Sequence, residues 1–194
     1  MIALVDCGTG EVEAVAASLE KLHAEYKISN NEIFICNADK IIFPGAGIAS
    51  LAMRKLHLNN LFSALRMIKQ PMLGIGLGMQ LMCNFSTEGN VAALGIFPGR
   101  VEKFVSPKMH VPHRGWKSVE LIKQSLLFNG ITSGEKFYFE HSYYIPVDDY
   151  STSISENGIP FSASIEYGKY FGVQFHPELS GQAGLTLLKN FVDL

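Results

Sequence analysis

Hydrophobic positions in the first half of the chain alternate between two patterns. Short runs of consecutive apolar residues are typical of buried strands, whereas apolar residues three and four positions apart are typical of helices. On this basis we predict strands over 1–5, 40–43 and 72–75, and helices over 12–22, 51–68 (broken near Asn59 and Asn60) and 77–85. Strands that alternate with helices predict an α/β fold built on a parallel sheet.

The second half of the chain has a different pattern after Ser86. Glycine and proline interrupt the apolar residues of 94–105, which indicates bent or antiparallel strands. We predict further strands over 137–144, 161–165 and 170–175, and a closing helix over 184–192 with Ser180 or Gly181 near its cap. Because no repeat or linker divides the sequence, we expect residues 1–194 to form a single domain.

The composition is that of a globular protein, with 47% hydrophobic and 18% charged residues. A net charge of -2 gives no basic footprint for nucleic acid, and no apolar run approaches a membrane helix. No basic region precedes the first strand, so we expect no signal peptide. Cys7, Cys36 and Cys83 are too scattered for a disulfide framework or paired metal ligands. We therefore expect a cytoplasmic protein without metal or cofactor.

The run Gly-Ile-Gly-Leu-Gly-Met-Gln at 74–80 joins a predicted strand to a predicted helix. A sharp turn of this kind raises one side chain above the sheet at a helix N-terminus, which is the geometry of an enzyme nucleophile. The raised residue is Gly76, which has no side chain. Three further segments follow predicted strands, namely the loops at 8–10 and 44–47 and the loop that begins with His176. We therefore expect a site where these loops meet.

Five motifs resemble those of the class I glutamine amidotransferases. They are PGAG at 44–47, GIGLGMQ at 74–80, VPHRGW at 111–116, HSYY at 141–144 and GVQFHPE at 172–178. They occur in the family's order from the first strand to the last helix, and they look most like those of HisH-type glutaminase subunits. The resemblance implies a three-layer sandwich around a mostly parallel sheet, and glutamine hydrolysis by a Cys-His-Glu triad whose cysteine position is Gly76.

The same resemblance assigns roles to the remaining catalytic positions. It makes His176 the general base and acid, and Glu178 the carboxylate that orients its ring. The backbone N–H groups of Gly47 and Leu77 would form the oxyanion hole. From spacing alone, His176 and Glu178 could be ordinary loop residues, and the PGAG run an ordinary glycine turn.

A glutamine-binding set also follows from the resemblance. Gln80 lies four residues after Gly76, which is one helical turn, so it should face the same opening. The resemblance implies that Gln80, Glu88 and the backbone of Ser142 and Tyr143 hold glutamine, with Glu88 pairing with its ammonium group. From the residues alone, Glu88 could equally be a solvated charge at a helix end.

The VPHRGW segment matches a stretch that lies close to the partner in the family. By resemblance that partner is a HisF-like (β/α)₈ cyclase, which uses the released ammonia to form the imidazole ring in histidine biosynthesis. We therefore expect His113 and Trp116 at a heterodimer interface, although Trp116 could also be a core aromatic. Glu11, His110, Arg114 and Lys117 stand where the family usually has Asn, Lys, Met and Asn. Those departures favour a second hypothesis, a paralogous subunit for another acceptor such as a surface sugar.

Gly76 decides the expected activity. Loss of the nucleophile of a catalytic unit typically lowers the rate about 10⁶-fold, so we predict that this chain cannot hydrolyse glutamine. We expect Cys83 about 10 Å further along the same helix, and Cys7 in a strand-end loop without an aligned oxyanion hole. A third hypothesis is therefore a non-catalytic glutamine-binding or scaffold protein. The same sequence would also result if glycine had replaced a cysteine at position 76 of an otherwise active enzyme.

Overall fold

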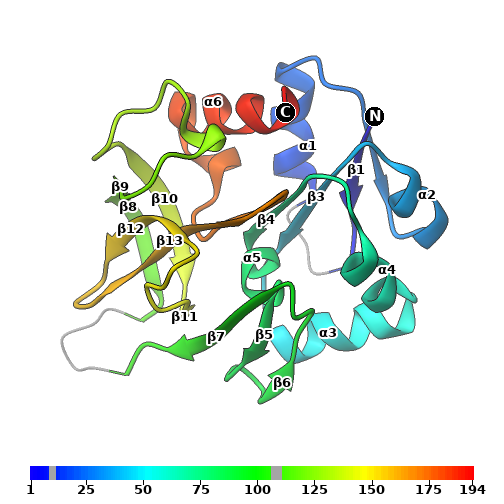
Figure 1. The fold of residues 1–194 in the computed structure, drawn as a ribbon, viewed down its shortest axis with the longest axis horizontal. Coiled ribbons are helices and arrows are strands. Elements are labelled where there is room, and N and C mark those ends of the chain that lie inside the picture. The colour runs from blue at the N-terminus through cyan, green and yellow to red at the C-terminus, as the bar shows by residue number, and fades with distance from the viewer. Residues whose placement is uncertain (9–11, 106–110) are drawn as a thin grey trace.

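An eight-stranded sheet forms the centre of the computed structural model, which describes residues 1–8, 12–105 and 111–194. Its strands, in spatial order, are β2 (Tyr26–Ser29), β1 (Ile2–Val5), β3 (Lys40–Gly45), β4 (Met72–Gly76), β14 (Tyr170–Val173), β13 (Pro160–Tyr167), β12 (Ser151–Glu156) and β9 (Glu120–Leu121). The strands from β2 to β14 are parallel, and β13, β12 and β9 continue the sheet in antiparallel pairing. The predicted α/β fold with a mostly parallel sheet is confirmed (Figure 1).

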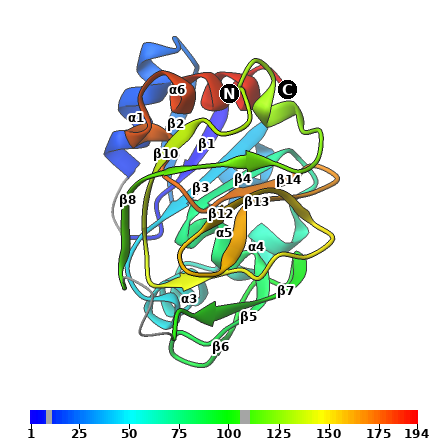
Figure 2. The same cartoon turned by 90° about the vertical axis from the view of Figure 1, so that its left-hand side faces the viewer.

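Helices cover both faces of the sheet. On one face lie α1 (Val12–Lys21) and α6 (Gly181–Val192); on the other lie α2 (Glu32–Asn37), α3 (Ala49–Leu58), α4 (Leu61–Met67) and α5 (Leu77–Leu81) (Figures 1 and 2). Successive strand residues point to opposite faces. Ile42 therefore packs in the buried cluster under α1 and α6, whereas Phe43 packs in the cluster under α3 and α4. The helices on the two faces and the sheet between them make the three layers, and one buried cluster fills each interface between layers.

Two smaller sheets lie beside the parallel part. One contains β11 (Tyr143–Tyr144), β7 (Phe97–Lys103), β5 (Cys83–Ser86) and β6 (Val91–Ala92); the other is the hairpin of β8 (His113–Ser118) and β10 (Lys136–His141). The short 3₁₀ helices are η1 (Leu126–Phe128) and η2 (Pro177–Leu179). The predicted strand at 137–144 is thus two strands, β10 and β11, with different partners.

The helix predicted over 77–85 is wrong after Leu81. The chain leaves α5 there, and Cys83 begins β5, which pairs with β6 and β7. Cysteine, asparagine, phenylalanine and serine are all weak helix formers, so strand pairing prevails over the apolar spacing. Cys83 is consequently not on the same helix as Gly76's neighbours, and Glu88 follows a strand instead of a helix.

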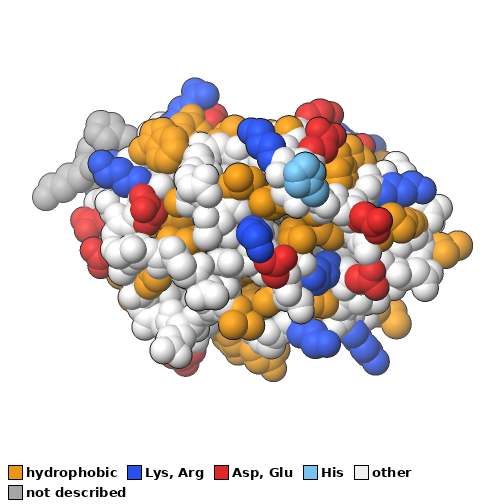
Figure 3. All heavy atoms as spheres, turned by 90° about the horizontal axis from the view of Figure 1, so that it is seen from above, with side chains coloured by type: hydrophobic (Ala, Val, Ile, Leu, Met, Phe, Trp, Pro, Cys, Tyr) orange, Lys and Arg blue, Asp and Glu red, His pale blue; other side chains and the backbone are white. Residues whose placement is uncertain are grey.

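One face of the surface and the lengths of the helices bear on the expected class of protein. In the part of the chain that the structure describes, no helix is long and apolar enough to cross a membrane. On the face seen in Figure 3, acidic and basic side chains are interspersed among apolar ones. Mixed charges of this kind do not form the continuous basic stripe of a nucleic-acid site.

Candidate functional site

The turn from β4 to α5 holds Gly76 in a conformation with φ +59° and ψ -117°. A Cβ atom on Gly76 would lie 3.2 Å from Cε1 and 3.5 Å from Nε2 of His176. Two residues on, a Cβ atom on Gly78 would lie only 1.8 Å from the carbonyl oxygen of Phe43, so the close approach of α5 to β3 requires glycine there. Position 76 therefore points at the His176 ring, as the elbow pattern predicts.

His176 and Glu178 follow directly after β14 and form a buried pair. The Nδ1 atom of His176 lies 2.8 Å from Oε1 of Glu178, and their side chains are only 5% and 1% exposed. Since a carboxylate only accepts hydrogen bonds, Nδ1 carries the hydrogen in this pair. The backbone is fixed as well, because the N–H of His176 donates to the carbonyl of Tyr138 and the Ser180 hydroxyl donates to the carbonyl of His176. This pair has the geometry of a histidine base with its orienting carboxylate.

A cavity of about 250 Å³ opens beside this pair. It is lined by Gly45, Ala46, Gly47, Leu77, Gln80, Glu88, Pro112, Glu140, His141, Ser142, Tyr143, Gln174 and His176. The structure thus brings together every predicted residue of the oxyanion hole and of the glutamine-binding set. Elementary strand geometry would have added Gln174, because it precedes His176 by two residues and therefore shares its side of the chain.

Gln80 is held in one orientation by two acceptors. Its Nε2 atom donates to the carbonyl of Tyr143 at 2.9 Å and to Oε1 of Gln174 at 2.8 Å. Both amide hydrogens are therefore used, which leaves the side-chain oxygen of Gln80 as the acceptor for a ligand. The three residues come from α5, β11 and the residue after β14, so the wall of the cavity ties these elements together.

The proposed oxyanion hole lies at the junction of β3 and α5. Gly45 stands opposite Gly76 in the β3–β4 register, and Gly47 follows with φ +90°. Such a positive φ favours glycine. Leu77 is the first residue of α5, so its N–H group is at the start of the helix, where backbone donors lack helical partners.

Glu88 lies at the edge of the cavity and is not a solvated helix-end charge. Its Oε2 atom accepts a hydrogen bond of 2.8 Å from the N–H of Ala49, the first residue of α3. Partial burial raises the pKa of the Glu88 carboxyl group, and the Ala49 bond opposes that rise. A partly desolvated carboxylate at the cavity edge suits an ammonium ligand.

The VPHRGW segment places its residues on two faces of β8. The His113 side chain is 1% exposed and points into the core, so the prediction that it meets a partner directly is wrong. Trp116 is 52% exposed and lies beside Tyr138, whose hydroxyl accepts a hydrogen bond from Nε of Arg114. Glu11 and His110, two of the departures from the family pattern, lie outside the described residues.

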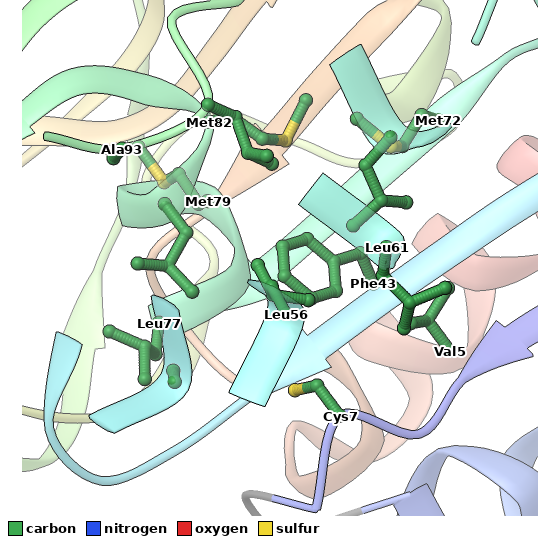
Figure 4. Close-up of a cluster of buried hydrophobic side chains, with 14 of the residues drawn as sticks. Val5, Cys7, Phe43, Leu56, Leu61, Met72, Leu77, Met79, Met82 and Ala93 are labelled. Carbon is green, nitrogen blue, oxygen red and sulfur yellow. The ribbon is translucent and has the colours of Figure 1, made fainter. Parts of the chain in front are cut away.

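Cys7 and Cys83 are both buried, and neither is among the described residues that line the cavity. Cys7 is 2% exposed at the end of β1 and packs in the cluster with Val5, Phe43 and Leu56 (Figure 4). Burial, with a smaller contribution from the charge of Asp148, raises the pKa of the Cys83 thiol to about 12. A thiol with that pKa supplies almost no thiolate at neutral pH.

Comparison with known proteins agrees with these observations. The family model described as Glutamine amidotransferase class-I matches residues 3–194. The chain is 41% identical over 196 residues to "Imidazole glycerol phosphate synthase subunit HisH" of Bacteroides fragilis, covering 100% of this chain and 99% of that protein. It is 40% identical over 192 residues to the protein of the same name from Haemophilus influenzae, covering 99% and 96%.

Solved structures show the same fold. A crystal structure titled as a glutamine amidotransferase superposes with a TM-score of 0.77 at 14% identity, covering 100% of this chain and 98% of that chain. A glutamine amidotransferase from Thermotoga maritima gives a TM-score of 0.66 at 16% identity, covering 94% and 77%. With its full-length relatives, its fold and its cavity, the chain belongs to the class I glutamine amidotransferases and, among them, to the HisH family.

Proposed function

We propose that this chain is the glutaminase-type subunit of imidazole glycerol phosphate synthase, and that it binds glutamine but does not hydrolyse it. The observation that carries the proposal is the direction of position 76, where a Cβ atom would point toward the His176 ring. A side chain at position 76 would begin 3.5 Å from Nε2 of the base, yet glycine supplies no atom beyond Cα. The His176–Glu178 pair, Gly47 and Leu77 lie around this position, which supports their proposed roles as base, carboxylate and backbone donors.

The missing step is the attack on the amide. In a Cys-His-Glu relative the histidine removes the thiol proton, the thiolate attacks the amide carbon of glutamine, and ammonia leaves with a proton returned by the histidine. Water then hydrolyses the thioester to glutamate. Gly76 has no thiol to form that bond, Cys7 and Cys83 are buried away from the residues that line the cavity, and the pKa of the Cys83 thiol is raised to about 12.

Glutamine binding is supported by the donor and acceptor pattern of the wall. Glu88 offers a carboxylate for the ammonium group, and Gln80 offers its side-chain oxygen after both of its N–H groups are used. Ser142 and Tyr143 line the same cavity, and their backbone N–H groups are the proposed donors to the carboxylate of the ligand. Each polar end of glutamine thus has a partner of the right type.

The partner we propose is a HisF-like (β/α)₈ cyclase in a heterodimer. The names of the HisH relatives suggest it, and Trp116, which is 52% exposed, supplies an aromatic anchor of the kind enriched in interfaces. In that complex the chain would shape or gate a synthase that takes free ammonia, because it releases none from glutamine.

Calorimetry with L-glutamine tests the proposal, using the chain alone and then with a HisF-like cyclase. We expect saturable binding without release of glutamate, and a loss of binding in Gln80→Leu, which removes the amide from the wall. Glutamate release at an enzymatic rate would refute the inactive assignment. The absence of binding in both preparations would refute the glutamine site.

A second candidate function rests on the outward charges of the β8–β10 hairpin. Arg114 and Lys117 are exposed there, and Arg114 forms an ion pair with Glu140 at 3.3 Å. A paralogous subunit that serves another acceptor would need such a different surface. Failure to form a complex with a HisF-like cyclase, with glutamine binding retained, would favour this candidate or a partner-free glutamine-binding protein.

A further inference from the structure

Two buried histidines, His141 in the lining of the cavity and His113 next to it, have no role in the proposed function. Nδ1 of His113 is 2.9 Å from Nε2 of His141, and Nδ1 of His141 is 2.8 Å from the carbonyl oxygen of Tyr143. His113 is 1% and His141 7% exposed. Both rings lie among Phe104, Phe139 and Phe161, with ring centroids 5.1 to 6.3 Å apart.

The hydrogen positions in this pair follow from its end points. The carbonyl of Tyr143 can only accept, so Nδ1 of His141 is the donor. In a neutral His141 ring, Nε2 then accepts from the Nδ1–H of His113. Nε2 of His113 is left as a bare acceptor, and it is buried without a hydrogen-bond partner among the described residues. The pair therefore donates in one direction only, from His113 through His141 to Tyr143.

Burial keeps both rings neutral. It lowers the pKa of His113 to about 4, with a smaller effect of the Lys117 charge. It lowers the pKa of His141 to about 3, and the charges of His113 and His176 lower it further, against an opposing hydrogen bond to Tyr143. At neutral pH the donor direction is consequently fixed, because neither ring takes up a second proton.

This chain of hydrogen bonds ends at Tyr143, whose carbonyl also holds Gln80 in the cavity wall. The carbonyl of Tyr143 accepts from both His141 and Gln80, and the preceding carbonyl of Ser142 accepts from the N–H of Phe104. Ser142 and Tyr143, here called the strap, are thus held by Gln80, His141 and Phe104 while they line the cavity. Loss of the His141 donor would leave Gln80 as the side-chain donor to the Tyr143 carbonyl among the residues that the structure describes.

We infer that His113 and His141 are positioning residues, which set the Ser142–Tyr143 strap and the Gln80 amide for ligand binding. His113 fixes the tautomer of His141, and His141 fixes the carbonyl of Tyr143. This inference deepens the proposed function and rests on it for the identity of the ligand, glutamine. The positioning itself is a property of the free protein and can be measured without any ligand.

The test compares two substitutions at the same position. In His113→Leu the donor to His141 is lost. In His113→Asn the side-chain N–H₂ group stands near the place of Nδ1 and preserves it. The first readout is ¹⁵N NMR of the histidine rings and of the Gln80 side-chain amide in the ligand-free protein. The second is the affinity for L-glutamine by calorimetry, and His57→Leu, at an exposed histidine of α3, is the matched control.

We expect the unsubstituted protein to show His141 as the Nδ1–H tautomer. His113→Leu should shift the signals of the His141 ring and the Gln80 amide and weaken glutamine binding about tenfold, as expected for a lost buried hydrogen bond. His113→Asn should restore the signals and most of the affinity, and His57→Leu should change neither. Should the leucine variant fail to fold, His113→Gln takes its place, because its amide lies beyond the Nδ1 position.

Two results would overturn the inference. One is an Nε2–H tautomer at His141 in the unsubstituted protein. The other is a folded His113→Leu protein in which the Gln80 and His141 signals are unchanged. If the signals shift as expected while even the unsubstituted protein fails to bind glutamine, the positioning role stands and the proposed glutamine function fails.

Discussion

At the scale of the residue, the proposed loss of glutamine hydrolysis rests on Gly76. The elbow needs φ +59°, which costs a residue with a side chain on the order of 1–3 kcal/mol. Glycine adopts this conformation without strain. A glycine at this position therefore avoids strain in the turn and supplies no thiol, while His176 and Glu178 stay paired at 2.8 Å.

Restoring the thiol should restore reactivity. In Gly76→Cys the new Cβ atom would lie 3.5 Å from Nε2 of His176, so we expect stoichiometric labelling by a glutamine-like electrophile. The unfolding free energy should fall by about 1–3 kcal/mol because of the positive φ. Mass spectrometry locates the label, and urea unfolding measures the stability. A label on Cys7 in the unsubstituted chain would contradict this assignment.

Gly47 offers a test of the oxyanion hole in the same Gly76→Cys background. A Cβ atom on Gly47 meets no atom within 4 Å, so Gly47→Ala acts through its φ of +90° alone. We expect it to turn the peptide and to lower the rate of labelling or hydrolysis up to about 10²-fold, the loss of one oxyanion donor.

The matched control for Gly47→Ala is Gly168→Ala. Gly168 has φ +61° and is equally free of contacts, but it lies in the turn between β13 and β14. Gly168→Ala should lower the free energy of unfolding by an amount similar to that of Gly47→Ala, and it should leave the rate of labelling or hydrolysis unchanged. Equal loss of rate in both variants would mean that strain, and not the oxyanion hole, explains the effect.

At the scale of the element, the β8–β10 hairpin connects the surface to the site. Its outer face presents Trp116 and Tyr138, and the carbonyl of Tyr138 accepts from the N–H of His176. Its inner face carries His113 and His141, which reach the wall of the cavity. A partner bound on the outer face would therefore contact the element that positions both the base and the strap.

Trp116→Ala should weaken the complex with a HisF-like cyclase by about 30-fold or more, a typical loss for a buried aromatic anchor. The measurement is titration of the cyclase by calorimetry or surface binding. Tyr167→Ala, at an aromatic residue that is 56% exposed on β13, is the control and should leave the affinity unchanged. Equal affinities of the unsubstituted chain, Trp116→Ala and Tyr167→Ala for the cyclase would show that Trp116 is not at the interface.

The success of the sequence-based predictions also differs by element. The buried parallel strands and the elbow were predictable, because continuous apolar runs and strand-end glycines have a direct local cause. The strand β5 was not, because its pairing with β6 and β7 comes from distant residues. The same holds for His113, whose place in the core depends on the phase of β8 against β10 and not on its motif.

At the scale of the whole molecule, the two buried histidines link stability to pH. Their pKa values are lowered in the folded chain, to about 4 and about 3 from an ordinary 6.5. Above pH 6.5 they are neutral in both states. Between pH 6.5 and 4 the unfolded chain binds protons that the folded chain does not, so stability falls as the pH falls.

We expect this linkage to cost on the order of 2 kcal/mol for each histidine at pH 5 relative to pH 7.5. Urea unfolding at both pH values measures it. A protein with His113→Asn and His141→Asn should lose much of the difference, because asparagine does not titrate. A pH difference that is unchanged in this variant would show that other groups cause it.

Glutaminase turnover, measured side by side for this chain and for Gly76→Cys in the presence of a HisF-like cyclase, tests the central claim most directly. We predict glutamate release at the uncatalysed background for the chain with Gly76, and a gain of several orders of magnitude, up to about 10⁶-fold, for Gly76→Cys. Turnover by the Gly76 chain that matches the cysteine variant, or a folded cysteine variant that remains inactive, would contradict the account.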